Sequence, residues 1–179
     1  RVLKLAIKHN IKFCPSKSKF LVDKVNFLGQ QIQGDKLSIS DKHVKAIANY
    51  QTPRNVKSVR SLLGTVNYVS QFLPQKAALC KPLTELLSKK KHFRWDSACQ
   101  HSFMKIKEMV LNRPHLMMPD PGKPFHLRTQ TSNLGLGASL TQPYEDGPKP
   151  VAHFSRTLRN YEESYCSYDL EFLGVVEAL

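Results

Sequence analysis

The sequence predicts an α/β chain of 179 residues in three consecutive parts, residues 1–40, 41–92 and 93–179. Residues with high β propensity and glycine turn signals fill the end of the first part. Apolar residues repeat with helical spacing through the second part, which favours a group of short helices. Three strand-like segments and a final helical pattern follow in the third part, where strands in succession favour an antiparallel meander.

The first part is expected to contain one helix and a small β-hairpin unit. Residues 1–9 mix apolar and basic residues at near-helical spacing, and Asn10 is placed to end that helix. Residues 13–20, although a proline interrupts them, and residues 25–32 have the composition of a strand pair. Gly29 lies within the second segment, where it permits a bend or a bulge.

Helices are expected throughout the second part. Ser40 or Asp41 caps a first helix, which ends before Pro53. A third, short helix is expected around residues 82–87. The helix between them carries one continuous apolar stripe, closed by a proline and made of Val59, Leu62, Leu63, Val66, Val69 and Leu73.

A longer helix opens the third part, with Asp96 as its N-cap and an apolar stripe formed by Cys99, Phe103, Ile106 and Val110. Residues 112–124 hold four prolines and are expected to form a rigid extended connection. Strands are expected at residues 125–129, 136–141 and 151–154. The last helix, at residues 168–179, carries Phe172, Leu173, Val176 and Leu179 on one side.

The charge is strongly uneven along the chain. The formal net charge is +13, and residues 1–95 hold 19 Lys and Arg against 4 Asp and Glu. Residues 96–179 hold 8 against 10, so the positive charge lies in the first half. A surface of this sign attracts polyanions, above all nucleic-acid backbones. Arg54, Lys57 and Arg60 crowd the start of the second helix. Two interpretations stay open: these side chains contact phosphate, or they are merely solvated.

Several classes of protein find no support in the sequence. The four cysteines show no C-x-x-C spacing, and the histidines form no H-x-x-x-H pair, so neither a zinc site nor a disulfide framework is expected. No apolar run approaches 18 residues, and no signal-peptide pattern is present. We therefore expect an intracellular protein without a membrane partner.

Three segments, taken together, resemble one known family. Residues 25–32 resemble the F-L-G hairpin that forms the primer grip of reverse transcriptases. Residues 59–74, followed by residues 81–87, resemble the thumb of LTR retrotransposon polymerases. The third segment is similar to the Ty3/gypsy-type RNase H domain and holds its motifs in order, at residues 93–95, Cys99, Phe103, 119–120, 123–125, 129–132, 135–138 and 154–156.

The resemblance implies a domain order. Residues 1–40 would end a polymerase palm with a primer-grip-like hairpin, and residues 41–92 would form a helical thumb or connection. Residues 93–179 would be only the N-terminal part of an RNase H-like domain. Together with the charge, the resemblance predicts nucleic-acid contacts by Phe27, Leu28, Gly29, Arg54, Lys57, Arg60, Lys89, Lys90 and Lys91.

The same resemblance bears on catalysis. In the family, four carboxylates hold two Mg²⁺ ions, which stabilise the attacking water and the leaving oxygen. The first acid position is Gln130, a neutral amide, and the second is Glu171. The remaining acids would follow Leu179, and the polymerase Y-x-D-D motif is absent from the sequence. We therefore expect no stably bound Mg²⁺ and no catalysis by this chain alone, with a solvent-facing carboxylate as the alternative interpretation of Glu171.

Two hypotheses for the function follow. The first is a fragment of a retrotransposon reverse transcriptase/RNase H that binds RNA–DNA hybrid or template-primer duplex, with the remainder of the Pol polyprotein as its protein partner. The alternative is a host-retained, non-enzymatic module, derived from a retroelement, that binds nucleic acid or another protein. The flanking reading frame distinguishes the two hypotheses.

Overall fold

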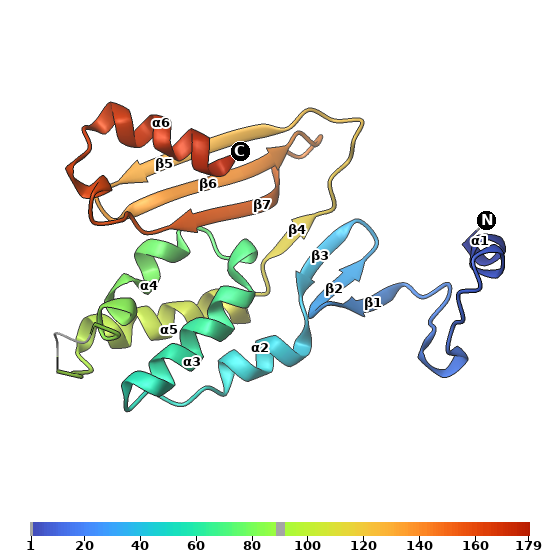
Figure 1. The fold of residues 1–179 in the computed structure, drawn as a ribbon, viewed down its shortest axis with the longest axis horizontal. Helices are drawn as coiled ribbons and strands as arrows, with labels where there is room; N and C mark the ends of the chain where they lie inside the picture. The colour runs from blue at the N-terminus through green and yellow to red at the C-terminus, as the bar shows by residue number, and fades with distance from the viewer. Residues whose placement is uncertain (1, 89–91) are drawn as a thin grey trace.

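The computed structural model describes residues 2–88 and 92–179, and Figure 1 shows how they are arranged. Helix α1 (Val2–Lys8) lies apart from the other elements at the N-terminal end. Asn10 follows it with a φ of 53°, the left-handed conformation that commonly ends a helix. The helix predicted over residues 1–9 is therefore confirmed.

The first sheet is antiparallel, with four strands in the order β1-β2-β3-β4. Strands β1 (Lys24–Phe27), β2 (Gln30–Gln33) and β3 (Lys36–Ile39) follow one another in the chain. Strand β4 (His115–Met117) comes from far along the sequence and pairs with β3. It lies in the proline-rich stretch for which the sequence predicts only an extended connection.

Two predictions for the first part are wrong. Residues 13–20 form no strand and contain the 3-10 helix η1 (Pro15–Lys17), because a proline lacks the N–H that a strand ladder needs. Residues 25–32 are not one strand with a bend or a bulge, although they do form a hairpin, as the resemblance predicts. They form the two strands β1 and β2, joined by a tight turn at Leu28 and Gly29.

Four helices make up the middle of the molecule: α2 (Asp41–Ala48), α3 (Val56–Tyr68), α4 (Lys76–Glu85) and α5 (Ser97–Leu111). The stripe predicted as one helix through Leu73 is divided, because α3 ends at Tyr68 and the 3-10 helix η2 (Ser70–Phe72) follows. Helix α4 begins earlier than predicted and contains Pro82. Asp96 caps α5 as predicted, accepting the Cys99 N–H at 2.8 Å.

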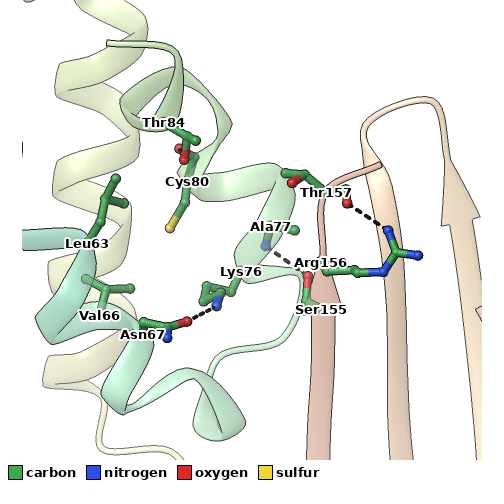
Figure 2. Close-up of a pocket in the computed structure, with 10 residues that line it drawn as sticks. All are labelled: Leu63, Val66, Asn67, Lys76, Ala77, Cys80, Thr84, Ser155, Arg156 and Thr157. Atoms are coloured by element: carbon green, nitrogen blue, oxygen red, sulfur yellow. Dashed lines mark hydrogen bonds between the residues drawn. The ribbon is translucent and has the colours of Figure 1, made fainter. Parts of the chain in front are cut away.

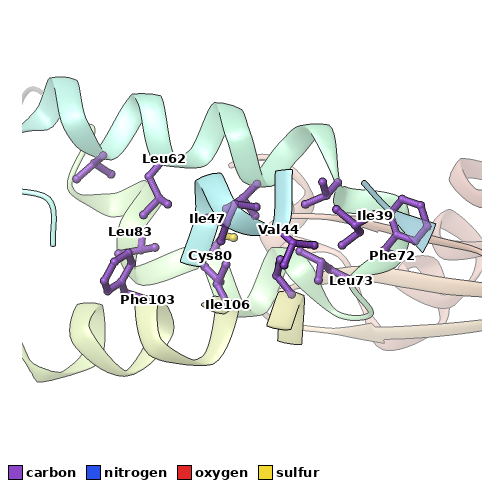
Figure 3. Packing of buried hydrophobic residues seen from close by; sticks show 14 of the residues in the cluster. Ile39, Val44, Ile47, Leu62, Phe72, Leu73, Cys80, Leu83, Phe103 and Ile106 are labelled. Atoms are coloured by element: carbon purple, nitrogen blue, oxygen red, sulfur yellow. The ribbon is translucent and has the colours of Figure 1, made fainter. Parts of the chain in front are cut away.

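These helices enclose the main hydrophobic core, which Figure 3 shows from close by. Each helix contributes a fully buried aliphatic side chain: Ile47, Leu62, Leu83 and Ile106. Ile39 and Leu116 of the first sheet join the same cluster. The stripe predicted for α5 is buried along its whole length, so that prediction is confirmed.

The second sheet is the predicted antiparallel meander of three strands, β5 (His126–Ser132), β6 (Gly135–Gln142) and β7 (Lys149–Arg156). A 3-10 helix, η3 (Glu162–Ser164), leads into α6 (Ser167–Ala178). Figure 1 shows α6 lying across the face of this sheet that is turned away from the other helices. The opposite face rests on η2 and α4.

On the apolar side of α6 that the sequence singles out, Leu173 is half-buried, whereas the other three residues are exposed. Leu170 and Gly174 are buried against the sheet, and Thr131 of β5 lies beside Gly174. Phe172 and Val176 are exposed, at 75% and 70% of their surface. No helix within residues 2–88 or 92–179 combines the length and the hydropathy needed to cross a membrane.

Candidate functional site

Gln130 lies near the end of β5, opposite Gly137 of β6. Alternation along the strand directs Thr129 and Thr131 toward α6 and Gln130 toward the opposite face. On that face, Oε1 of Gln130 accepts a hydrogen bond from Nε2 of Gln75 at 3.1 Å. Because Gln75 directly precedes α4, this bond ties the second sheet to the start of that helix.

Glu171 is exposed on α6 and borders the same hollow as Gln130. This hollow measures about 540 Å³ and is completed by Thr129, Thr131, Phe172 and Val175. The structure therefore brings together the two positions that the resemblance assigns to acids. The Gln130 amide, however, is hydrogen-bonded on the face of the sheet that is turned away from α6.

The Mg²⁺ that the family resemblance implies does not fit these two residues. Mg²⁺ prefers several hard, anionic oxygen ligands, whereas this pair supplies one carboxylate and one neutral amide. Within residues 2–88 and 92–179, no three His, Cys, Asp or Glu side chains lie close enough to share a metal ion. A two-metal site of the family's kind would need further acidic ligands besides Glu171.

An ion-pair network joins β7, η3 and α6, and sequence reasoning overlooks it. Arg156 donates to both carboxylate oxygens of Glu162, at 2.7 and 2.9 Å, and to Glu177 at 2.7 Å. Hydrogen bonds from Arg156 lower the pKa of Glu162 to about 2, and the Arg159 N–H adds to this effect. Such bidentate pairs fix geometry as well as charge, so the network sets the position of α6 and of Glu171 on it.

The second sheet meets the helical part at the start of α4, as Figure 2 shows. Oγ of Ser155 accepts the Ala77 N–H at 2.9 Å and so satisfies one of the free N–H groups of the first helical turn. Lys76 donates to Oδ1 of Asn67 at 2.8 Å. A hollow of about 370 Å³ lies here, and burial raises the pKa of Cys80 beside it to about 11. A thiol with a raised pKa is a poor nucleophile, so this hollow holds no activated cysteine.

The F-L-G segment lies at a surface turn of the first sheet. Phe27 is the last residue of β1, and Leu28 and Gly29 are the two residues that connect it to β2. Phe27 and Leu28 expose 60% and 72% of their surface. We refer to residues 27–29 as the hairpin turn. Two apolar side chains presented at a turn are available for contact with a partner.

The predicted basic cluster lies at the opposite end of α3. Arg54, Lys57 and Arg60 are all exposed, and no acidic side chain of the described residues pairs with them. Asn55 and Ser58 form a capping box, which satisfies the Ser58 N–H without an outside anion. The remaining predicted contacts lie outside the described residues: Lys89, Lys90 and Lys91.

Gly64 is a further exposed position on α3 that sequence reasoning misses. Its signal is a glycine in the middle of an amphipathic helix, which lowers helix stability. A Cβ added there would meet no atom within 4 Å, so packing inside the chain does not explain it. Helical spacing places Lys57, Arg60, Gly64 and Tyr68 along one face, which we call the α3 strip.

Comparison with known proteins shows what the chain is similar to. Residues 95–179 match the family described as the RNase H-like domain found in reverse transcriptase. The Pol polyprotein from transposon opus of Drosophila melanogaster is 32% identical over 99% of this chain, which covers 19% of that relative. The Pol polyprotein from transposon gypsy of the same species is 32% identical over 99% of this chain and 18% of its own length.

More distant relatives and solved structures are also similar to nearly the whole chain. The Tf2-3 polyprotein of Schizosaccharomyces pombe is 28% identical over 95% of this chain and 13% of that relative. A foamy viral protease-reverse transcriptase in complex with double-stranded DNA has the same fold over 99% of this chain and 31% of its own, with a TM-score of 0.81 and 22% identity. A foamy viral protease-reverse transcriptase in complex with RNA/DNA hybrid matches 91% of this chain and 22% of its own, with a TM-score of 0.76 and 24% identity.

The chain spans about a fifth, or less, of the curated relatives it matches. The matches nevertheless cover nearly all of it in sequence and in fold. Residues 95–179 therefore match the RNase H-like domain found in reverse transcriptase, and nearly all of the chain is similar in sequence to retrotransposon Pol polyproteins.

Proposed function

We propose that this chain is part of a Ty3/gypsy-type reverse transcriptase that binds RNA–DNA hybrid or template-primer duplex and does not cut it. Residues 1–40 end the polymerase palm, residues 41–92 form the thumb or connection, and residues 93–179 begin the RNase H-like domain. The order of the three resemblances and the homology to Pol polyproteins support this arrangement. The foamy viral proteins of similar fold are in complex with double-stranded DNA and with RNA/DNA hybrid, which supports the choice of ligand.

We base this proposal on the α3 strip, which joins cations to the hairpin turn along a single face. Lys57 and Tyr68 are eleven residues apart, which corresponds to about 17 Å along a helix axis. That length matches about five base pairs of a duplex. Lys57 and Arg60 are placed to meet phosphates at one end, and the exposed Phe27 and Leu28 lie at the other.

Gly64 supports the same surface. It lies between the cations and Tyr68 on the strip, and its missing side chain leaves the helix backbone open to close approach. A glycine is favoured where a ligand must approach the backbone closely, even though it destabilises a helix. The proposed partner is therefore a bulky, negatively charged surface that lies flat on α3.

The donor set supports a non-catalytic role. Gln130 provides an amide that is already hydrogen-bonded to Gln75, and Glu171 provides a single carboxylate. One acid cannot hold the two Mg²⁺ ions that in-line hydrolysis of a phosphodiester needs. On this proposal, incubation of the chain with hybrid and Mg²⁺ leaves the hybrid intact on a denaturing gel.

The proposed protein partner is a further segment of a longer polyprotein, and α6 offers a place for it. Tyr168, Phe172, Val176 and Leu179 form an exposed apolar face on the side of α6 away from the sheet. Strand β5, next to this helix, pairs on one side with β6. The relatives are several times longer than this chain, which makes additional polypeptide the proposed cover for this face.

The test is binding of a labelled RNA–DNA hybrid, measured by fluorescence anisotropy. The variant Lys57→Gln/Arg60→Gln removes two cations of the strip and is expected to weaken binding about tenfold or more. The matched control, Lys105→Gln/Arg128→Gln, removes the same charge from α5 and β5. It is expected to bind within about twofold of the unchanged protein, because these cations lie off the strip.

Equal losses in the two double variants would show that net charge alone attracts the hybrid and would contradict a defined surface. Absence of binding by the unchanged protein would contradict the proposed function itself. Mg²⁺-dependent cutting would contradict the non-catalytic role.

A further inference from the structure

The hairpin turn has an unusual backbone. Leu28 and Gly29 have φ values of 46° and 73°, so both central residues lie in the left-handed region, as in a type I′ turn. Gly adopts this region freely, whereas a leucine there is unfavourable because its Cβ crowds the backbone. Leu28 gains no compensating burial, since 72% of its surface is exposed. Something other than core packing must therefore hold the turn.

Contacts from the helical part hold it. The Tyr68 hydroxyl, at the end of α3, donates a hydrogen bond to the Leu28 carbonyl at 2.5 Å, across 40 residues of sequence. The His43 ring of α2 stacks on Tyr68, with the ring centres 4.6 Å apart and the planes 15° from parallel. Nδ1 of His43 is hydrogen-bonded to Oγ of Ser40 at 2.8 Å. The Ser40 N–H in turn donates to the Gly29 carbonyl at 3.3 Å, which closes the set of contacts.

The fit at Gly29 leaves no room for a side chain. A Cβ at this position would lie 2.5 Å from the Tyr68 hydroxyl oxygen and 2.8 Å from Cε1 of His43. Glycine is thus required both for the positive φ and for the close approach of two aromatic rings. The pair made by Tyr68 and His43, which we call the clamp, therefore rests directly on the turn.

We infer that the clamp residues Tyr68 and His43 are positioning residues, which hold the hairpin turn so that Phe27 and Leu28 meet bound duplex. This inference rests on the proposed function. A strained residue kept exposed by contacts from elsewhere is typical of a functional position, because folding alone gains nothing from the strain. Tyr68 also ends the α3 strip, so the clamp connects the cationic face of α3 to the turn in one rigid unit.

The test uses the full chain and a short RNA–DNA hybrid that carries a photo-activated cross-linker on the DNA strand. Tyr68→Phe removes the hydroxyl and keeps the ring stack on His43. It is expected to weaken hybrid binding about threefold to tenfold, as loss of one hydrogen bond predicts. Cross-linking to the tryptic peptide of residues 25–36, read by mass spectrometry, is expected to fall with it, because the turn no longer faces the duplex.

The control is Tyr161→Phe, which removes a hydroxyl that is hydrogen-bonded to Arg159 in the third part. Tyr161 is 57% exposed and Tyr68 is 52% exposed, so the two changes are matched. Tyr161→Phe is expected to change neither affinity nor cross-linking. His43→Ala, which removes the stack, is expected to behave like Tyr68→Phe, and His43→Phe, which restores an aromatic ring, is expected to recover most of the affinity.

Hybrid binding by Tyr68→Phe with the affinity and cross-linked peptide of the unchanged protein would overturn this inference and leave the proposed function intact. The same holds if His43→Phe binds as weakly as His43→Ala, because a stacking role requires recovery. No binding by the unchanged protein would overturn the proposed function and, with it, the inference.

Discussion

Helices α3 and α6 both carry an apolar stripe in the sequence, yet they are packed in opposite ways. In α3 the stripe is the buried side, and Val59, Leu62 and Val66 have at most 1% of their surface exposed. In α6 the conspicuous residues Phe172 and Val176 face outward, and the helix packs through Leu170 and Gly174. A stripe thus predicts a buried side only where the chain itself provides a covering layer.

The stripes of α3 and α6 are expected to differ most in how much their side chains contribute to the free energy of unfolding. Leu62→Ala leaves a cavity in the main core and is expected to lower the free energy of unfolding by about 2–5 kcal/mol. Phe172→Ala removes a larger side chain from an exposed face and is expected to change it by less than about 0.5 kcal/mol. Urea unfolding followed by circular dichroism measures both. Similar losses for the two variants would mean that the face of α6 is covered within this chain.

The ion pairs of Arg156 are expected to make the stability of the fold depend on pH. Arg156 pairs with Glu177 of α6 and with Glu162 of η3, and its hydrogen bonds lower the pKa of Glu162 from 4.5 to about 2. A lowered pKa in the folded state stabilises the fold above the unfolded value and loses that stabilisation as the pH falls. Stability is therefore expected to decrease between about pH 5 and pH 2.

Glu162→Gln tests this origin of the pH dependence. The variant is expected to be less stable than the unchanged protein at pH 7, and the difference is expected to shrink as the pH approaches 2. Urea midpoints at a series of pH values measure the difference. A constant difference across that range would show that Glu162 does not carry the effect.

Replacing one glycine of each helix by alanine is expected to give a smaller change in the free energy of unfolding, of opposite sign in the two helices. Gly64→Ala adds a side chain in open space and is expected to raise the free energy of unfolding by about 0.5–1 kcal/mol, because alanine favours helices. Gly174→Ala places a Cβ 2.7 Å from Cγ2 of Thr131 and is expected to lower it. Gly64→Ala is also expected to weaken hybrid binding. A variant that is more stable and binds equally well would remove Gly64 from the proposed surface.

Local signals predicted much of the fold. Asp96, followed by apolar residues at helical spacing, predicted α5 and its buried side, because a cap and a stripe both act within one helix. The three strands of the second sheet were predicted for the same reason, from alternation and turn residues. The pairing of β4 with β3 was not predicted, because it joins positions about 80 residues apart and a three-residue strand has too little pattern of its own.

The resemblance predicted residues of the candidate site, but the sequence did not predict the hydrogen bonds that these and other residues form with distant positions. Gln130 and Glu171 were singled out by the resemblance, and the structure places them on one hollow. The bond from Gln75 to Gln130 and the bond from Tyr68 to Leu28 were not predictable, because each joins distant positions through a single contact. Gly64 and Gly174 look alike in sequence, and only their surroundings in the fold separate an open face from a close-packed one.

The salt dependence of hybrid binding measures whether α3 carries a phosphate-binding surface. Lys57 and Arg60 contact two phosphates on our account, so their replacement by Gln is expected to reduce the slope of log affinity against log salt by about 1.8. The Lys105→Gln/Arg128→Gln control is expected to keep the slope of the unchanged protein. An unaltered slope in the Lys57→Gln/Arg60→Gln variant, or binding that salt does not weaken, would contradict a phosphate-binding surface on α3.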